Sequence, residues 1–144
     1  MAKETSIESS SSAASGRMRA NRSRDTKPEL SLRSELHRRG LRFRVDLKPE
    51  ASLRTRADIV FTRARVAVFV DGCFWHGCPE HGTSPRANAR FWREKIASNK
   101  KRDDRATEDL QRLGWAVVRV WEHEATRDAA DRVCQAVARM RAKP

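Results

Sequence analysis

The sequence has little of what a secreted or membrane protein needs. Its three cysteines, an odd number in 144 residues, argue against a framework of disulfide bonds. No apolar stretch approaches the roughly 20 residues that a membrane span requires, and the first residues lack the apolar core of a signal peptide. We therefore expect a cytoplasmic protein with reduced thiols and no membrane contact, in which clustered Cys and His favour metal binding.

Acidic residues are scarce relative to basic ones. The chain has 31 Lys and Arg against 19 Asp and Glu, which gives a formal net charge of +12. A charge this large favours a polyanionic partner, although a solvated basic surface is the alternative explanation. Together with four Trp residues, whose rings can stack on bases, it favours nucleic acid.

The N-terminal region differs in composition from the rest. Residues 1–16 are Ser-rich and cannot build a core, so we expect a disordered tail. Residues 17–144 then form a single domain, which opens on a basic arm at 17–25. In this arm Arg19 is suited to a DNA phosphate and Met18 to an apolar probe of the minor groove, whereas a solvated linker is the alternative. Nothing in the sequence indicates an obligate dimer, so we expect a monomer.

The pattern of apolar residues predicts an α/β sandwich with a mixed central sheet flanked by helices. Thr26, Pro28 and Glu29 form a capping box that starts a helix, and Gly40 ends it. The elements that follow are strands at 41–46, 56–62 and 66–70, a helix at 90–113, a strand at 115–121 and a helix at 128–140. We expect the two long helices to bury stripes formed by Leu30, Leu32 and Leu36 in the first and by Trp92, Ile96, Leu110 and Leu113 in the second.

The stretch 66–81 carries most of the chemically active side chains. An apolar strand closes at Gly72 and is followed by Cys73, Cys78 and His81, with His123 at the end of the last strand. Two thiolates and two imidazoles suit a tetrahedral Zn(II), which would be structural because no position stays open. Glu80 could replace His81, and two buried thiols with two surface His are the alternative to a metal site.

A second cation site is predicted around Asp58. A carboxylate within an apolar strand is costly to bury, which indicates a function. Mg(II) takes one or two carboxylates, and the backbone carbonyl of Val70 on the neighbouring strand could add a ligand. His76, left free by the zinc assignment, could accept a proton from water, or it could merely be exposed. Glu29 is either functional or only a helix cap.

Aromatic side chains interleave with basic ones. Phe74 and Trp75 lie on a polar loop, and Trp92 begins the long helix whose basic face includes Lys95. Such rings can stack on bases or wedge between base pairs, although Trp92 fits a core role equally well.

These motifs together resemble the very short patch repair (Vsr) DNA mismatch endonucleases. The resemblance covers about residues 17–125. It is carried by Asp25-Thr26-Lys27-Pro28-Glu29, Arg56-x-Asp58, Val70 to His76, Phe91-Trp92-Arg93-Glu94-Lys95-Ile96 and Trp121-Glu122. It implies a restriction-endonuclease-like fold and a Mg(II)-dependent nick 5′ of the thymine in a T·G mismatch in double-stranded DNA.

The resemblance also implies roles for single residues. Asp58 matches the metal-binding Asp, Val70 the residue that gives a carbonyl to the metal, His76 the catalytic His and Glu29 the N-terminal functional Glu. The intercalating aromatics are matched by Phe74, Trp75 and Trp92, the minor-groove wedge by Met18, and the zinc-ligand positions by Cys73 and Cys78. His123 stands where many members of the family have Cys.

The sequence departs from the best-known members of that family at two positions near the chemistry. Asp71 stands where they have His, and could bind metal or polarise water instead, and Ala57 replaces Pro. Two alternatives therefore stay open: a related nuclease with a different or broader DNA target, and a catalytically inactive, zinc-stapled DNA-binding module.

Overall fold

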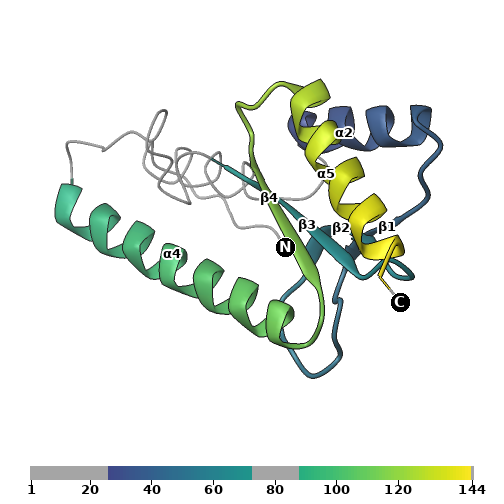
Figure 1. Cartoon of the computed structure of the whole chain (residues 1–144). Helices are drawn as coiled ribbons and strands as arrows, with labels where there is room; N and C mark the ends of the chain where they lie inside the picture. Colours follow the sequence, from purple (N-terminus) through teal and green to yellow (C-terminus); the bar gives the residue numbers. More distant parts are fainter. Residues whose placement is uncertain (1–25, 73–87, 144) are drawn as a thin grey trace, which may run out of the picture.

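The structure is a computed structural model that describes residues 26–72 and 88–143 (Figure 1). In chain order the described elements are α2 (Lys27–Arg38), β1 (Arg44–Leu47), β2 (Ala57–Phe61), β3 (Val66–Asp71), α4 (Ala89–Arg112), β4 (Ala116–Trp121) and α5 (Thr126–Arg141). This succession of one helix, three strands, a helix, a strand and a helix confirms the predicted order, within the described part of the chain. The expected tail at 1–16 and arm at 17–25 lie outside it.

Local sequence accounts for the boundaries of α2. Thr26 is extended and its hydroxyl oxygen accepts the N–H of Glu29 at 3.5 Å, while Pro28 occupies the first turn. Gly40, just beyond the helix, has φ of +87°, a conformation that costs glycine little. The helix therefore begins and ends where the sequence predicts, and its start holds Glu29 at a fixed place.

The sheet is mixed and has the strand order β1-β2-β3-β4. The pairs β1–β2 and β2–β3 are antiparallel, whereas β3 and β4 run parallel from Val66 opposite Ala116 to Asp71 opposite Trp121. The carboxyl ends of β3 and β4 consequently meet at one edge of the sheet. The chain leaves β3 toward residues 73–81 and β4 toward His123 at this same edge.

Two cores cover the two faces of the sheet. On one face α5 packs on β3 and β4, and α2 packs against α5 (Figure 1). The buried residues of this core include Leu36, Ile59, Val68 and Val133. On the other face Leu110 of α4 packs near Val60, Ala67, Phe69 and Trp115. Burial on both faces explains why β3 is an uninterrupted apolar run.

Some sequence-based expectations about the helices were wrong. Leu30 and Leu113 were expected to face inward, yet their side chains are 49% and 44% exposed. Leu30 lies two residues, or about 200° of helix rotation, from Leu32, and Leu113 lies beyond the last turn of α4. The first strand begins at Arg44 rather than Leu41, and the last helix begins at Thr126 rather than Asp128. Within the described residues, no helix is long and apolar enough to cross a membrane.

Candidate active site

Asp58 is fixed at the edge of the sheet by a backbone group of the neighbouring strand. The N–H of Val70 donates a hydrogen bond of 2.7 Å to Oδ2 of Asp58. The paired residues of β2 and β3 run from Ile59 opposite Val68 to Phe61 opposite Val66, so Asp58 lies just beyond the last pair. Its carboxylate thus accepts the next N–H of β3, which restricts the side chain to one orientation and confirms that Asp58 and Val70 lie side by side.

The surroundings of Asp58 disfavour its negative charge. The pKa of Asp58 is raised to about 7 from the ordinary 3.8, chiefly by burial and also by the nearby charges of Glu29 and Asp71, while the Val70 N–H and Arg33 act in the opposite direction. Glu29 of α2 and Asp71 of β3 therefore both lie close enough to Asp58 of β2 to disfavour its negative charge. A cation at this place would offset that effect.

The side chain of Glu29 is buried and ion-paired, in addition to being part of the capping box. Its side chain is only 5% exposed, and Oε1 lies 3.3 Å from Nη2 of Arg33 one turn further along α2. The helix start is capped by the hydroxyl of Thr26. The capping motif therefore holds Glu29 in a buried position from which its charge acts on Asp58, which agrees with a functional role.

Asp71 has a partner that sequence reasoning missed. Nη1 of Arg119 lies 3.0 and 3.2 Å from its two carboxylate oxygens, and Asp71 is 6% exposed. Arg119 also donates to Oγ1 of Thr107 at 2.9 Å and to the carbonyl of Asp103 at 3.2 Å, and its guanidinium lies 4.1 Å from the centre of the Phe69 ring. Asp71 is thus held by a cation that is itself clamped between β3 and α4.

The sequence contained a signal for this ion pair. Arg119 interrupts the apolar strand AVVRVW, just as Asp58 interrupts ADIVF. A charge within a buried strand requires a partner, so the argument applied to Asp58 applied equally to Arg119. The signal of Arg119 is weak on its own because Arg is abundant throughout this chain.

Most of the predicted metal ligands fall in the part that the structure does not describe. Cys73, Cys78 and His81 (with Glu80 as the alternative) and His76 lie outside residues 26–72 and 88–143. Within those ranges no three His, Cys, Asp or Glu side chains are arranged to hold a metal ion. The zinc and magnesium assignments therefore stay predictions.

His123 is the one predicted zinc ligand that lies among the described residues. His123 lies two residues beyond the end of β4 and is exposed, and the N–H of the preceding Glu122 donates to the carbonyl of Asp71 at 2.9 Å. This bond aligns the end of β4 with the end of β3, two residues before Cys73. The chain thus leaves β3 and β4 at neighbouring points, which agrees with zinc ligands drawn from the residues that follow each strand.

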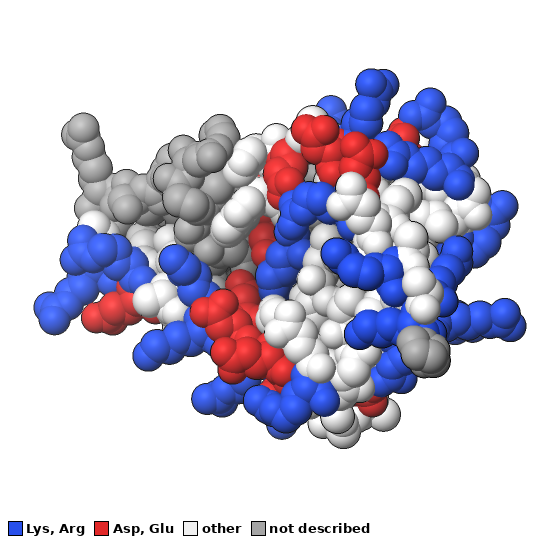
Figure 2. Space-filling model, viewed as in Figure 1, with Lys and Arg blue, Asp and Glu red and all other residues white. Residues whose placement is uncertain are grey.

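The predicted DNA-contacting residues also lie partly outside and partly inside the described ranges. Met18, Arg19, Phe74 and Trp75 lie outside the described residues. On α4, the half-buried Trp92 meets Phe91 edge-on with ring centres 5.1 Å apart, and the Phe91 side chain is 57% exposed. Basic side chains line α4 in Figure 2, and the members expected to be exposed are so: Lys95, Lys100, Lys101, Arg102 and Arg105.

Comparison with known proteins supplies the family. The profile of the family described as DNA mismatch endonuclease Vsr matches residues 9–81, which include Glu29, Asp58 and the 73–81 stretch. The chain is 48% identical over 114 residues to the type II nicking enzyme V.NaeI of Lentzea aerocolonigenes, covering 78% of this chain and 69% of that protein. This protein belongs to the Vsr family.

Other Vsr relatives carry names of the same kind. The type II nicking enzyme V.NmeDIP of Neisseria meningitidis serogroup C is 39% identical over 125 residues, with 83% of this chain and 82% of that protein covered. The DNA mismatch endonuclease Vsr of Escherichia coli K12 is 44% identical over 109 residues, or 73% of this chain and 66% of that protein. The chain is accordingly an endonuclease of the Vsr type, and the carboxylates around Asp58 are its candidate active site.

Proposed function

We propose that this Vsr protein hydrolyses one phosphodiester bond of double-stranded DNA, immediately 5′ of the thymine in a T·G mismatch, with Mg(II) as cofactor. The observation that carries the proposal is the placement of Asp58, held by the Val70 N–H and close to Glu29 and Asp71, in a chain related to nicking enzymes. A pure binding module would have no use for a buried carboxylate whose charge two neighbouring carboxylates disfavour.

The described residues fit a magnesium ion. Asp58 offers a carboxylate of fixed orientation and Val70 a backbone carbonyl, both hard oxygen donors of the kind that Mg(II) prefers. Mg(II) keeps several waters and needs only one or two protein carboxylates, so the lack of a larger acidic cluster among residues 26–72 and 88–143 agrees with it. When bound, the ion would neutralise the scissile phosphate and the leaving oxygen.

The chain's own residues supply the remaining requirements. Because the pKa of Asp58 is raised to about 7, its carboxyl is partly protonated at neutral pH without a cation and loses that proton when a cation binds. Arg119 holds Asp71 in place beside this group. His76 is the proposed acceptor of the proton from the attacking water.

Recognition of the mismatch would rest on the aromatic residues. Opening the base stack costs least at a mismatched pair, and contacts made to the widened DNA offset that cost. Trp92 and the exposed Phe91, with Lys95 one turn along α4, form a surface suited to this task. Phe74 and Trp75 would contribute from the 73–81 stretch, and Met18 and Arg19 from the arm at 17–25.

The finer organisation is part of the same proposal. Residues 17–144 would act as one restriction-endonuclease-like domain after a disordered tail at 1–16. Zn(II) on Cys73, Cys78, His81 and His123 would tie the loop after β3 to the end of β4. A monomer suffices because a nick in one strand needs one active site, and the enzyme would act on DNA in the cytoplasm.

A second candidate function is a nick at another DNA target. It is favoured by relatives such as V.NaeI and V.NmeDIP, whose names describe type II nicking enzymes and mention no mismatch. A cleavage assay at low salt with Mg(II) separates the two, using end-labelled duplexes with T·G in varied contexts beside matched T·A and C·G duplexes. A product only 5′ of the mismatched thymine supports the proposal. Cleavage of matched duplexes supports the second candidate, and mismatch-dependent binding without any product would indicate an inactive module.

A further inference from the structure

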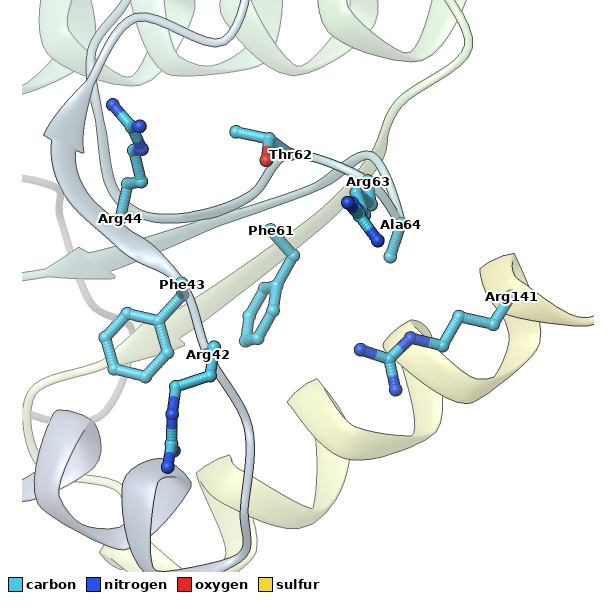
Figure 3. A pocket seen from close by; sticks show the side chains of 8 residues that line it. All are labelled: Arg42, Phe43, Arg44, Phe61, Thr62, Arg63, Ala64 and Arg141. Atoms are coloured by element: carbon cyan, nitrogen blue, oxygen red, sulfur yellow. The ribbon is translucent and has the colours of Figure 1, made fainter.

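A second charged pocket lies at the opposite end of the sheet from Asp71. It opens between the segment before β1, the turn after β2 and the C-terminal end of α5, and has a volume of about 430 Å³ (Figure 3). Four arginines contribute to its lining, Arg42, Arg44, Arg63 and Arg141, together with the hydroxyl of Thr62. None of the described residues that line it carries a carboxylate.

These arginines differ from most of the others in the described chain. Arg39, Arg119 and Arg132 each contact a carboxylate at 3.0 Å or less. Among the described residues, by contrast, Arg44, Arg63 and Arg141 have no hydrogen-bond or ion-pair partner, and Arg42 reaches only the carbonyl of Leu41 at 3.1 Å. Several unneutralised guanidinium groups around one pocket repel one another until an anion joins them.

The shape of the pocket suits a phosphate group. In Figure 3 the side chain of Arg141 extends from α5 toward the Phe61 ring, and Arg42 lies on the other side of that ring, in the segment before β1. Planar guanidinium groups pair with phosphate oxygens through two parallel hydrogen bonds, and a threonine hydroxyl can donate another. Figure 2 shows blue side chains around the C-terminal end of α5, so an approaching polyanion meets positive charge there.

We infer that this arginine pocket binds a backbone phosphate of the DNA at a distance from the nicked bond. The stretch from the turn after β2 to Asp71 spans roughly 20 Å at the rise of an extended strand, which corresponds to about six base pairs of duplex. The inference rests on the proposed action on DNA. In this arrangement the pocket contacts the DNA that flanks the mismatch, and the active site acts at the mismatch itself.

The test compares two duplexes with the same central T·G mismatch, one of about 10 base pairs and one of about 30 base pairs. The double variant Arg63→Gln/Arg141→Gln removes two exposed charges from the pocket. The matched control Arg127→Gln/Arg139→Gln removes two exposed charges from α5 that do not line it. Affinity is measured over a series of salt concentrations, with circular dichroism to verify folding.

The pocket variant should bind the long duplex about tenfold more weakly at low salt, with a salt dependence reduced by about one per lost phosphate contact, and should match the control on the short duplex. Equal affinity of both variants for the long duplex would overturn the inference and leave the pocket to an acidic protein or a small anion. An equal loss on both duplexes would also overturn it. If the unsubstituted protein binds neither duplex, the proposed function itself fails, which is a separate result.

Discussion

The backbone N–H of Val70 donates a 2.7 Å hydrogen bond to Oδ2 of Asp58, across the edge of the sheet where the pairing of β2 and β3 has ended. One N–H thus orients the carboxylate that the surrounding structure makes costly to ionise. A cation that took oxygens from both residues would find them already placed by the sheet. The site is therefore preorganised, as a site that stabilises developing charge must be.

Removal of the charge of Asp58 should stabilise the cation-free protein at high pH. The folded-state pKa of about 7 exceeds the ordinary 3.8, so the contribution of Asp58 to stability is fully present below about pH 4 and is lost as the pH rises through 7. Asp58→Asn, which keeps an oxygen for the Val70 N–H, should raise the free energy of unfolding by up to about 4 kcal/mol near pH 8 and by little near pH 4. Urea unfolding without added Mg(II) measures this. The exposed Asp128→Asn is the control, and a parallel pH dependence of both variants would contradict the account.

The buried pair of Asp71 and Arg119 should matter more for stability than an exposed pair. Arg119→Met leaves a carboxylate that is 9% exposed without its cation and should cost about 3 kcal/mol. Arg112→Met breaks a surface pair with Asp109, in which the arginine side chain is 70% exposed, and should cost less than about 1 kcal/mol. Denaturant titration compares the two variants. Similar losses in both would mean that Arg119 does not hold Asp71.

Two tryptophans of the sequence should separate DNA binding from folding. Trp115→Ala opens a core in which that side chain is 6% exposed and should cost about 3–5 kcal/mol of stability. Trp92→Ala should cost less stability and should weaken binding to mismatched DNA by about 5- to 100-fold, the value of one stacked base. Thermal unfolding and fluorescence anisotropy give the two quantities. A Trp92 variant that loses stability and keeps its affinity for DNA would assign Trp92 to the core.

Zinc removal provides an independent test of the predicted ligand set. If Cys73, Cys78, His81 and His123 hold Zn(II), a chelator should lower the melting temperature, and His123→Ala should lower zinc content in the same way. Cys134→Ala is the matched control, since that thiol lies on α5 beside Arg39. Elemental analysis and calorimetry report both effects. Unchanged thermal stability after complete removal of zinc would rule out a structural role.

Local sequence determined most of the fold and part of the site. The capping box at Thr26 and the apolar runs of β2 and β3 predicted both the elements and their order, because these signals act within a few residues. Asp58 was found because a carboxylate is costly in a buried strand. Its pairing with the N–H of Val70 depends on the register of two strands, which the sequence does not fix.

The features that the sequence did not reveal are those assembled from distant segments. Arg119 meets Asp71 only because β3 and β4 pair in parallel, and Arg141 and Arg63 line the same pocket only because α5 returns along the sheet. Leu30 and Leu113 show the opposite failure, in which an apolar residue was assigned to a core that the helix does not reach there. Both failures arise because the periodicity of apolar residues describes one helix or strand at a time and does not describe how distant segments pack together.

Asp58→Asn in a nicking assay tests the central claim most directly. Protein and variant are incubated at low salt with Mg(II) and an end-labelled duplex that carries one T·G mismatch, and bound and nicked DNA are quantified in the same samples. The account predicts that the variant binds the duplex with affinity similar to that of the unsubstituted protein and that its nicking rate falls at least about 1,000-fold, while Asp128→Asn nicks normally. Nicking by Asp58→Asn at the rate of the unsubstituted protein would show that the carboxylate held by Val70 is not part of the active site.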